Sequence, residues 1–383
     1  MKNISKYLIV FFFCLLFFLG YVLGRFSYLP VGQNSTGSLK DSVVPVAQQF
    51  GEISSETNSE TNSETNKEIN IEKIFYMSRL KEKDGIESLK QNAEKIDILA
   101  PQFYEVSEKL VLTGGLGAEL KDIIIQKNLK IMPLVANAGF KQNIIHDLLV
   151  SPVAQEAVIK GLISLAEKND YIGWQFDFEN ISYLDRDLYS AFVEKTAKSF
   201  KENGLILSVA AVTRSVDYED TDAFKNWAGV FDYARISRVV DFISLMTYDD
   251  PNSVGPVASL PFINKVLNYV KDKIPPEKLS FGIPLYYWGW STDPVKKITA
   301  SGTYQRLSDI KSNFLHDLGF DEALGASWMT YSWQNKQYIL WFQDKQGFGN
   351  KLDIIKQNNF RGFSAWVLGV EDPEIWSVLS STH

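Results

Sequence analysis

The chain has 383 residues, of which 45% are hydrophobic and 13% are aromatic, and it carries a formal net charge of -7. This acidic balance excludes nucleic acid as a partner, because binding that polyanion requires clustered Lys and Arg side chains. The single cysteine, Cys14, lies inside the first apolar run. The sequence therefore predicts no disulfide framework, no zinc-cysteine cluster and no thiol nucleophile in the folded part.

The first thirty residues are typical of a targeting segment. Lys2 and Lys6 precede an apolar run over residues 7–23, and Arg25 follows it. The run is longer than the core of most signal peptides and just long enough to cross a bilayer. Residues 1–30 are therefore either an uncleaved membrane anchor, which we favour because no small-residue cleavage site follows, or a cleaved signal. In both cases we expect the rest of the chain to be extracytoplasmic, either anchored or secreted.

Residues 31–70 are polar and repetitive. The sequence Ser-Glu-Thr-Asn occurs three times in succession over residues 55–66. Such low-complexity sequence offers few apolar side chains to a core. We expect a disordered linker here and one folded domain over residues 71–383.

After the linker, short apolar, β-branched or aromatic runs alternate with amphipathic stretches. The runs predict eight strands, over residues 74–77, 96–100, 129–134, 171–178, 205–210, 240–248, 279–285 and 360–367. Most gaps between them fit one helix and two loops, which is the repeat of a parallel α/β barrel. The pattern predicts an α/β fold, a (β/α)8 TIM barrel. A doubly wound open sheet is the alternative, but no Gly-rich phosphate loop follows the first strand.

Residues 187–203 illustrate why the gaps are expected to be helical. Asp185 can cap the start of this helix, and Gly204 can end it. Its buried face is predicted to consist of Leu188, Phe192, Val193, Thr196 and Phe200.

The gap before the eighth strand is longer than the others. It contains an aromatic stretch over residues 328–342, in which two runs flank Gln334, Asn335 and Lys336. This arrangement predicts a β-hairpin. We therefore expect a small α+β insertion between strands seven and eight, at about residues 291–342.

The fourth predicted strand combines aromatic and acidic side chains. Side chains alternate along a strand, so Gln175, Asp177 and Glu179 share one face, and Trp174 and Phe176 share the other. If the aromatic face meets the helices, the polar face points into the barrel, where an unpaired carboxylate is costly. Glu179 falls at the C-terminal end of the strand, which is the catalytic face of TIM barrels. An ion-paired strand end is the structural alternative.

The fourth strand resembles that of glycoside hydrolase family 18, the chitinase and endo-N-acetylglucosaminidase family, whose strand carries Asp-x-x-Asp-x-Asp-x-Glu. Asp177 and Glu179 match the last two acids. Residues 246–249, 281–284 and 362–366 match further family motifs in the same order, on predicted strands six, seven and eight. The resemblance covers about residues 74–376 and extends to the bacterial wall-lytic or spore-lytic branch.

Two positions depart from the family pattern. Ile172 and Gln175 stand where the family has its first and second acids. The loss of the second acid removes a carboxylate that would share protons with Asp177, and this is expected to change the pH profile.

The resemblance implies substrate-assisted cleavage of β-linked N-acetylglucosamine-containing glycans. Glu179 would protonate the glycosidic oxygen, and Asp177 would orient the acetamido group and stabilise the positive intermediate. Tyr248 and Asp249 would hold the acetamido group. Trp366 would lie beneath the sugar. Gln175 and Met246 complete the predicted substrate-binding set.

Several alternatives remain open from the sequence. A non-catalytic glycan-binding member of the family is one, although such members usually lose the acid that Glu179 preserves. A lytic enzyme acting on peptidoglycan is another, although we find no wall-binding repeat. No His, Asp and Glu spacing is typical of a metal site, so we expect no metal and no cofactor. We expect a monomer whose only membrane contact is the N-terminal segment.

Overall fold

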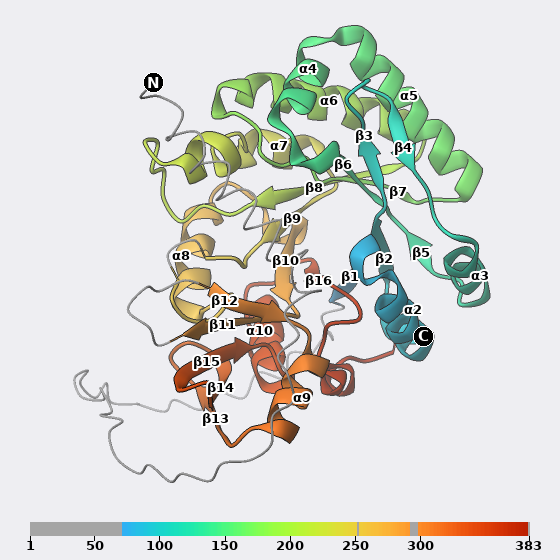
Figure 1. Cartoon of the computed structure of the whole chain (residues 1–383). Coiled ribbons are helices and arrows are strands. Elements are labelled where there is room, and N and C mark those ends of the chain that lie inside the picture. The colour runs from blue at the N-terminus through green and yellow to red at the C-terminus, as the bar shows by residue number, and fades with distance from the viewer. Residues whose placement is uncertain (1–70, 251–252, 292–297, 382–383) are drawn as a thin grey trace, which may run out of the picture.

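The computed structural model describes residues 71–250, 253–291 and 298–381, which form a parallel barrel surrounded by helices (Figure 1). The predicted TIM barrel is confirmed. The barrel strands are β1 (Glu72–Ser78), β2 (Ile98–Gln102), β5 (Lys130–Ile131) with β6 (Leu134–Asn137), β7 (Gly173–Phe176), β8 (Ile206–Val212), β9 (Phe242–Met246), β10 (Leu279–Pro284) and β16 (Gly362–Trp366). A short hairpin of β3 (Tyr104–Val106) and β4 (Leu112–Gly114) extends the sheet beside β6.

The third predicted strand is split in two. β5 pairs with β2, whereas β6 pairs with β7, so the two short pieces together close the barrel. Pro133 lies between them. Because proline has no backbone N–H to donate, it interrupts the ladder at this point.

Helices cover the outside of the barrel. They are α2 (Glu82–Asn92), α3 (Ala118–Gln126), α4 (Gln142–Val150), α5 (Pro152–Asn169), α6 (Arg186–Glu202), α7 (Tyr233–Val239), α8 (Leu260–Val270) and α10 (Lys345–Gln357). Trp174, Phe176 and Phe178 lie on the helix-facing side of the fourth barrel strand and are fully buried. The aromatic face therefore builds the outer core, as the alternation predicted.

Helix α6 corresponds to the helix predicted over residues 187–203, with two corrections. Leu188 is 39% exposed, and Tyr189 lies in the core instead. Asp185 makes no capping bond, because its carboxylate contacts Nδ1 of His146 at 2.9 Å. The other predicted core residues are buried: Phe192, Val193, Thr196 and Phe200. Gly204 ends the turn with a φ of 68°, a conformation that glycine adopts without strain.

The predicted insertion between strands seven and eight is present as an antiparallel sheet with one helix, α9 (Tyr304–Asn313). Its strands are β11 (Tyr287–Ser291), β12 (Ile298–Gly302), β13 (His316–Asp321), β14 (Ala326–Trp333) and β15 (Lys336–Phe342). The predicted hairpin joins β14 to β15. Figure 1 shows this sheet beside α8, and the Leu260 N–H donates to Leu324 O across that boundary at 2.9 Å.

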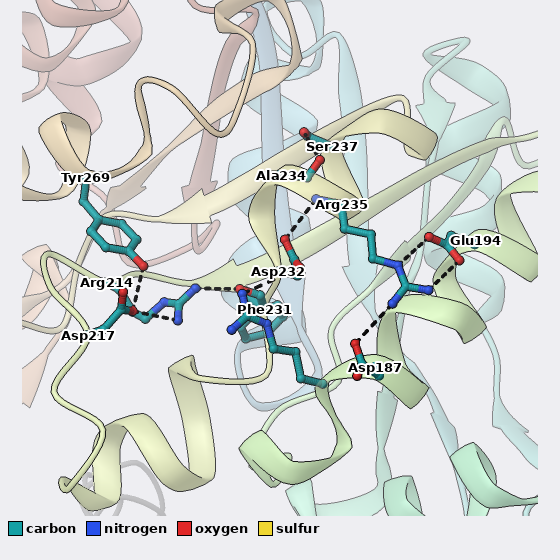
Figure 2. Close-up of polar contacts among 11 residues, drawn as sticks. Asp187, Glu194, Arg214, Asp217, Phe231, Asp232, Ala234, Arg235, Ser237 and Tyr269 are labelled. Carbon is teal, nitrogen blue, oxygen red and sulfur yellow. Dashed lines mark hydrogen bonds and ion pairs between the residues drawn. The ribbon is translucent and has the colours of Figure 1, made fainter.

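Ion pairs fix the loop that follows β8 (Figure 2). Arg235 on α7 binds both carboxylate oxygens of Glu194 on α6, at 2.6 and 2.8 Å. Arg214, a buried residue of this loop, donates to Asp217 at 3.0 Å, and the hydroxyl of Tyr269 donates to the same carboxylate at 2.7 Å. The loop is thus tied to α8 through Asp217, and α7 is tied to α6 through Arg235.

The predicted anchor over residues 1–30 and the linker over residues 31–70 lie outside the described residues. Among the helices that the structure describes, none alone is long and apolar enough to span a membrane. α4 and α5 together have the length and apolar composition of a membrane span, but they are bent by 102° relative to each other.

Candidate active site

The interior of the barrel beneath the predicted acids is filled by a hydrogen-bonded polar layer. Oε1 of Gln175 accepts from the hydroxyl of Tyr76 at 2.7 Å. Its amide nitrogen donates to Ser208 and to Ser244, both at 2.8 Å. Ser244 and Ser280 in turn bond to Ser364, at 2.8 and 2.6 Å. Gln175 is 0% exposed, so it lies under the site and not on its surface.

Asp177 and Glu179 lie above this layer at the end of the fourth barrel strand. Their carboxyl groups are hydrogen-bonded to each other. Burial raises the pKa of both carboxyl groups, and the charges of Asp177 and Asp249 raise the pKa of Glu179 further. Because two acids so close together cannot both ionise readily, the pair keeps one proton, and Glu179 is the favoured holder.

Two amide side chains from neighbouring strands hold these acids, and neither was predicted from the sequence. Gln102, at the end of β2, donates to Oδ2 of Asp177 at 2.6 Å. Asn137, at the end of β6, accepts from the Glu179 N–H at 3.1 Å and donates to the Glu179 carbonyl at 3.0 Å. Their position could have identified them in the sequence, because each residue lies at the C-terminal end of a barrel strand, on the catalytic face.

The segment after β9 forms one wall of the site. The hydroxyl of Thr247 donates to the carbonyl of Gly282 on β10 at 2.6 Å, which fixes the segment against the next strand. A Cβ atom at Gly282 would lie 2.5 Å from the carbonyl oxygen of Leu245 and 2.9 Å from the Tyr248 ring. Only glycine permits β10 to lie this close to the segment after β9, which explains why position 282 of the motif over residues 281–284 is glycine.

Tyr248 and Asp249 reach the same group of acids. Burial raises the pKa of Tyr248 well above its ordinary value, and the charges of Tyr76 and the three acids add to this effect. Asp249 is an exposed residue, but protein atoms crowd its carboxyl group and raise its pKa to about 6. It accepts a hydrogen bond from the hydroxyl of Tyr286. Tyr248 therefore remains a neutral hydrogen-bond donor across the physiological pH range.

Trp366 and Met246 lie at the ends of β16 and β9, and both are half-buried. The Trp366 ring centroid is 5.4 Å from that of Tyr76, at an interplanar angle of 55°. Trp366 is thus packed on one side against the barrel and partly open on the other. By contrast, Trp288 and Trp290 of the insertion are buried, at 6% and 7% exposure.

The structure therefore brings together most of the predicted site. Asp177, Glu179, Tyr248 and Asp249 interact directly or through their charges. In the part of the chain that the structure describes, no group of three or more His, Cys, Asp and Glu side chains could hold a metal ion. A protonated carboxyl group beside an ionised one can donate a proton to a leaving group and stabilise positive charge nearby.

The chain is similar to several known proteins. The uncharacterized glycosylase YvbX of Bacillus subtilis (strain 168) is 26% identical over 268 residues, covering 66% of this chain and 75% of YvbX. The cortical fragment-lytic enzyme of the same organism is 26% identical over 274 residues, covering 68% of this chain but only 62% of that enzyme. The crystal structure of the Bacillus megaterium QM B1551 spore cortex-lytic enzyme SleL superposes with a TM-score of 0.72 at 23% identity, covering 80% of this chain and 73% of SleL.

The family comparison covers most of the chain. The model of the glycosyl hydrolases family 18 matches residues 58–371, which contain the barrel, its insertion and the four acidic and tyrosine side chains of the site. The chain belongs to glycosyl hydrolase family 18 and is a glycosidase of that family.

Proposed function

We propose that this glycosidase cleaves β-linked N-acetylglucosamine-containing glycans with retention of configuration, using the substrate's acetamido group as nucleophile. One observation carries the proposal: Glu179, the predicted acid, shares a hydrogen bond with Asp177. Retaining enzymes with two catalytic carboxyl groups hold them about 5–5.5 Å apart, on opposite sides of the sugar. Two carboxyl groups in direct contact cannot flank a sugar ring. Asp177 therefore does not attack across the sugar from Glu179, and the acetamido group of the substrate takes that role.

The residues of the site support each step of this reaction. Glu179 donates its proton to the glycosidic oxygen while the acetamido oxygen attacks the anomeric carbon. Asp177 accepts the acetamido N–H and stabilises the cyclic oxazolinium ion. Glu179, now ionised, then takes a proton from the water that opens this ion, so the acid is regenerated.

The wall and the mouth of the site orient the substrate. The Tyr248 hydroxyl is a suitable donor to the acetamido oxygen, and Asp249 lies beside Glu179 at the mouth. Trp366 offers the exposed part of its ring as a surface for the sugar. Gln175 contributes indirectly, because its amide is enclosed in the polar layer below Asp177.

The relatives favour the glycan strands of peptidoglycan as the first substrate to test. Two of them are named for action on the spore cortex or its fragments, although the chain spans 62% of one of these enzymes. Fragments of chitin and of N-glycans carry the same acetamido group and are the competing substrates. We further propose that the enzyme works outside the cytoplasm, since residues 1–30 have the composition of a membrane anchor or a signal peptide.

Incubation with peptidoglycan fragments, chitin oligosaccharides, N-glycans and cello-oligosaccharides tests the proposal. We expect cleavage of N-acetylated substrates alone, with mass spectrometry identifying the products and NMR showing the retained anomer. Glu179→Gln and Asp177→Asn should each lower turnover by ~10² or more with unchanged folding. Equal cleavage of cello-oligosaccharides would contradict substrate assistance, and binding without cleavage would indicate a lectin.

A further inference from the structure

The carboxylate of Asp177 has two hydrogen-bonding partners that differ in kind. Glu179 lies two residues further along the segment that follows β7, and it titrates with Asp177. Gln102 comes from β2, which is 75 residues away in sequence, and its amide does not titrate. The 2.6 Å contact between Nε2 of Gln102 and Oδ2 of Asp177 is short for an amide donor, as hydrogen bonds to charged acceptors are.

Gln175, the residue that replaces a family acid, cannot perform this task. Its amide nitrogen carries two hydrogens, and both are donated to serine hydroxyls at 2.8 Å. Its carbonyl oxygen is occupied by the Tyr76 hydroxyl. Gln175 therefore has no donor left for Asp177, and the polar layer beneath Asp177 contains no carboxylate from the residues that the structure describes.

We propose that Gln102 is a positioning residue, which keeps Asp177 ionised and turned toward Glu179 so that one proton stays on the acid. The inference rests on the proposed function, in which Asp177 must be negative when the positive intermediate forms. A donor that favours the ionised form offsets part of the cost of burying that charge. A neutral amide does so without adding a second titrating group.

The surroundings of Asp177 make this contribution decisive. The titratable groups that interact with Asp177 are Glu179 after β7, Tyr76 on β1, Tyr189 on α6 and Tyr248 after β9. Asp249 interacts with Glu179. None of these groups is a cation. The ionised form of Asp177 is therefore stabilised by its hydrogen bonds, which come from Gln102 and Glu179.

Gln102→Met tests the inference, because methionine has similar length and no donor. Gln155→Met is the matched control, since Gln155 is also half-buried and donates to the carbonyl of Leu149 at 2.8 Å, outside the site. We measure the titration of the Asp177 carboxyl carbon by NMR in the full chain and assign its signal with Asp177→Asn. Loss of the donor should raise the lower apparent pKa of the pair by roughly one unit, and the control should not change it.

The kinetic counterpart is the pH profile of kcat/KM on the N-acetylated substrate that the wild type cleaves. In Gln102→Met the acid limb should move to higher pH by the same amount, with KM nearly unchanged. Gln102→Glu, which keeps the shape of the side chain and adds a charge, should also raise the lower apparent pKa of the pair. This variant replaces Gln102→Met in both experiments if the methionine variant does not fold.

An unchanged Asp177 titration in a folded Gln102 variant would overturn the inference, even if the wild type cleaves its substrate normally. Conversely, a wild type that cleaves none of the glycans contradicts the proposed function. The NMR titration still decides whether Gln102 controls the charge of Asp177, because it requires no turnover.

Discussion

At the scale of single residues, the site depends on placing two acids where only one can be charged. Burial raises the pKa of both Asp177 and Glu179, and this is unfavourable for the folded chain at neutral pH. The buried pair thus lowers the stability of the folded chain, but it keeps one carboxyl group protonated at a pH at which most glutamates are ionised. The Asn137 side chain adds rigidity by holding both backbone polar groups of Glu179.

Glu179→Gln should therefore be more stable than the wild type at pH 8 and equally stable at pH 4. The folded-state pKa of Glu179 lies above its unfolded value, so its contribution to stability is present at low pH and is lost as the pH rises through the folded pKa. Glutamine never ionises and avoids this loss. Thermal unfolding at both pH values measures the effect, with Glu202→Gln at the exposed end of α6 as control. A lower melting temperature than wild type at pH 8 would refute it.

Asn137→Ala should lower kcat by roughly 10²-fold while KM changes little, because small displacements of a catalytic group have effects of this size. The variant loses both contacts to the Glu179 backbone. Asn137→Asp retains the acceptor for the Glu179 N–H and should be less impaired at low pH, where the carboxyl group is neutral and can donate. Steady-state kinetics separates the two parameters. A rise in KM alone would show that Asn137 does not position Glu179.

At the scale of elements, the insertion adds a second, smaller core beside the barrel. This core includes Tyr287, Met329 and Leu340, which are buried together. The hairpin between β14 and β15 turns at Gln334 and Asn335, whose φ angles are 50° and 59°. Two successive left-handed residues are typical of a type I′ turn, for which Asn-Gly is the favoured sequence.

Replacing these two residues by Asn-Gly should stabilise the insertion by about 1 kcal/mol, because glutamine is strained in the left-handed region. Urea unfolding measures the change, and kcat should not change because the turn is outside the site. Gln337→Asn, which lies in β15 after the turn, is the control. A destabilised double variant would show that other contacts of these side chains outweigh the relief of strain.

At the scale of the whole molecule, eight strands bring the ends of distant segments to one rim. β2, β6, β7, β9 and β16 all contribute side chains to the site. Residues at the opposite end of the barrel serve the core, as is general for this fold. The site therefore forms only when the barrel is closed.

Deletion of residues 1–70 should leave a melting temperature equal to that of a chain beginning at Val31, because the intervening sequence is polar and repetitive. Differential scanning calorimetry of the two proteins checks this expectation. A difference of several degrees would mean that residues 31–70 contribute to the folded state.

The sequence by itself determined the order and approximate positions of the barrel strands, the inward direction of Asp177 and Glu179, and the hairpin of the insertion. It did not predict the split of the third strand at Pro133. The predicted properties are local, because alternation along a strand and turn residues act over a few positions. For α6 the same local pattern predicted a core position for Leu188, and the structure buries Tyr189 there. Helix periodicity fixes a face only to within about one residue, and packing against the barrel decides the rest.

Only the tertiary structure decided which side chains hold the acids and how deep each polar residue lies. Gln102 and Asn137 are 75 and 42 residues from their partners, and no local pattern connects them. The alternation rule placed Gln175 on the same face as the acids, but the structure buries it in the layer beneath them. Depth inside a barrel depends on how eight strands are staggered against one another, a relation that exists only after the sheet has closed.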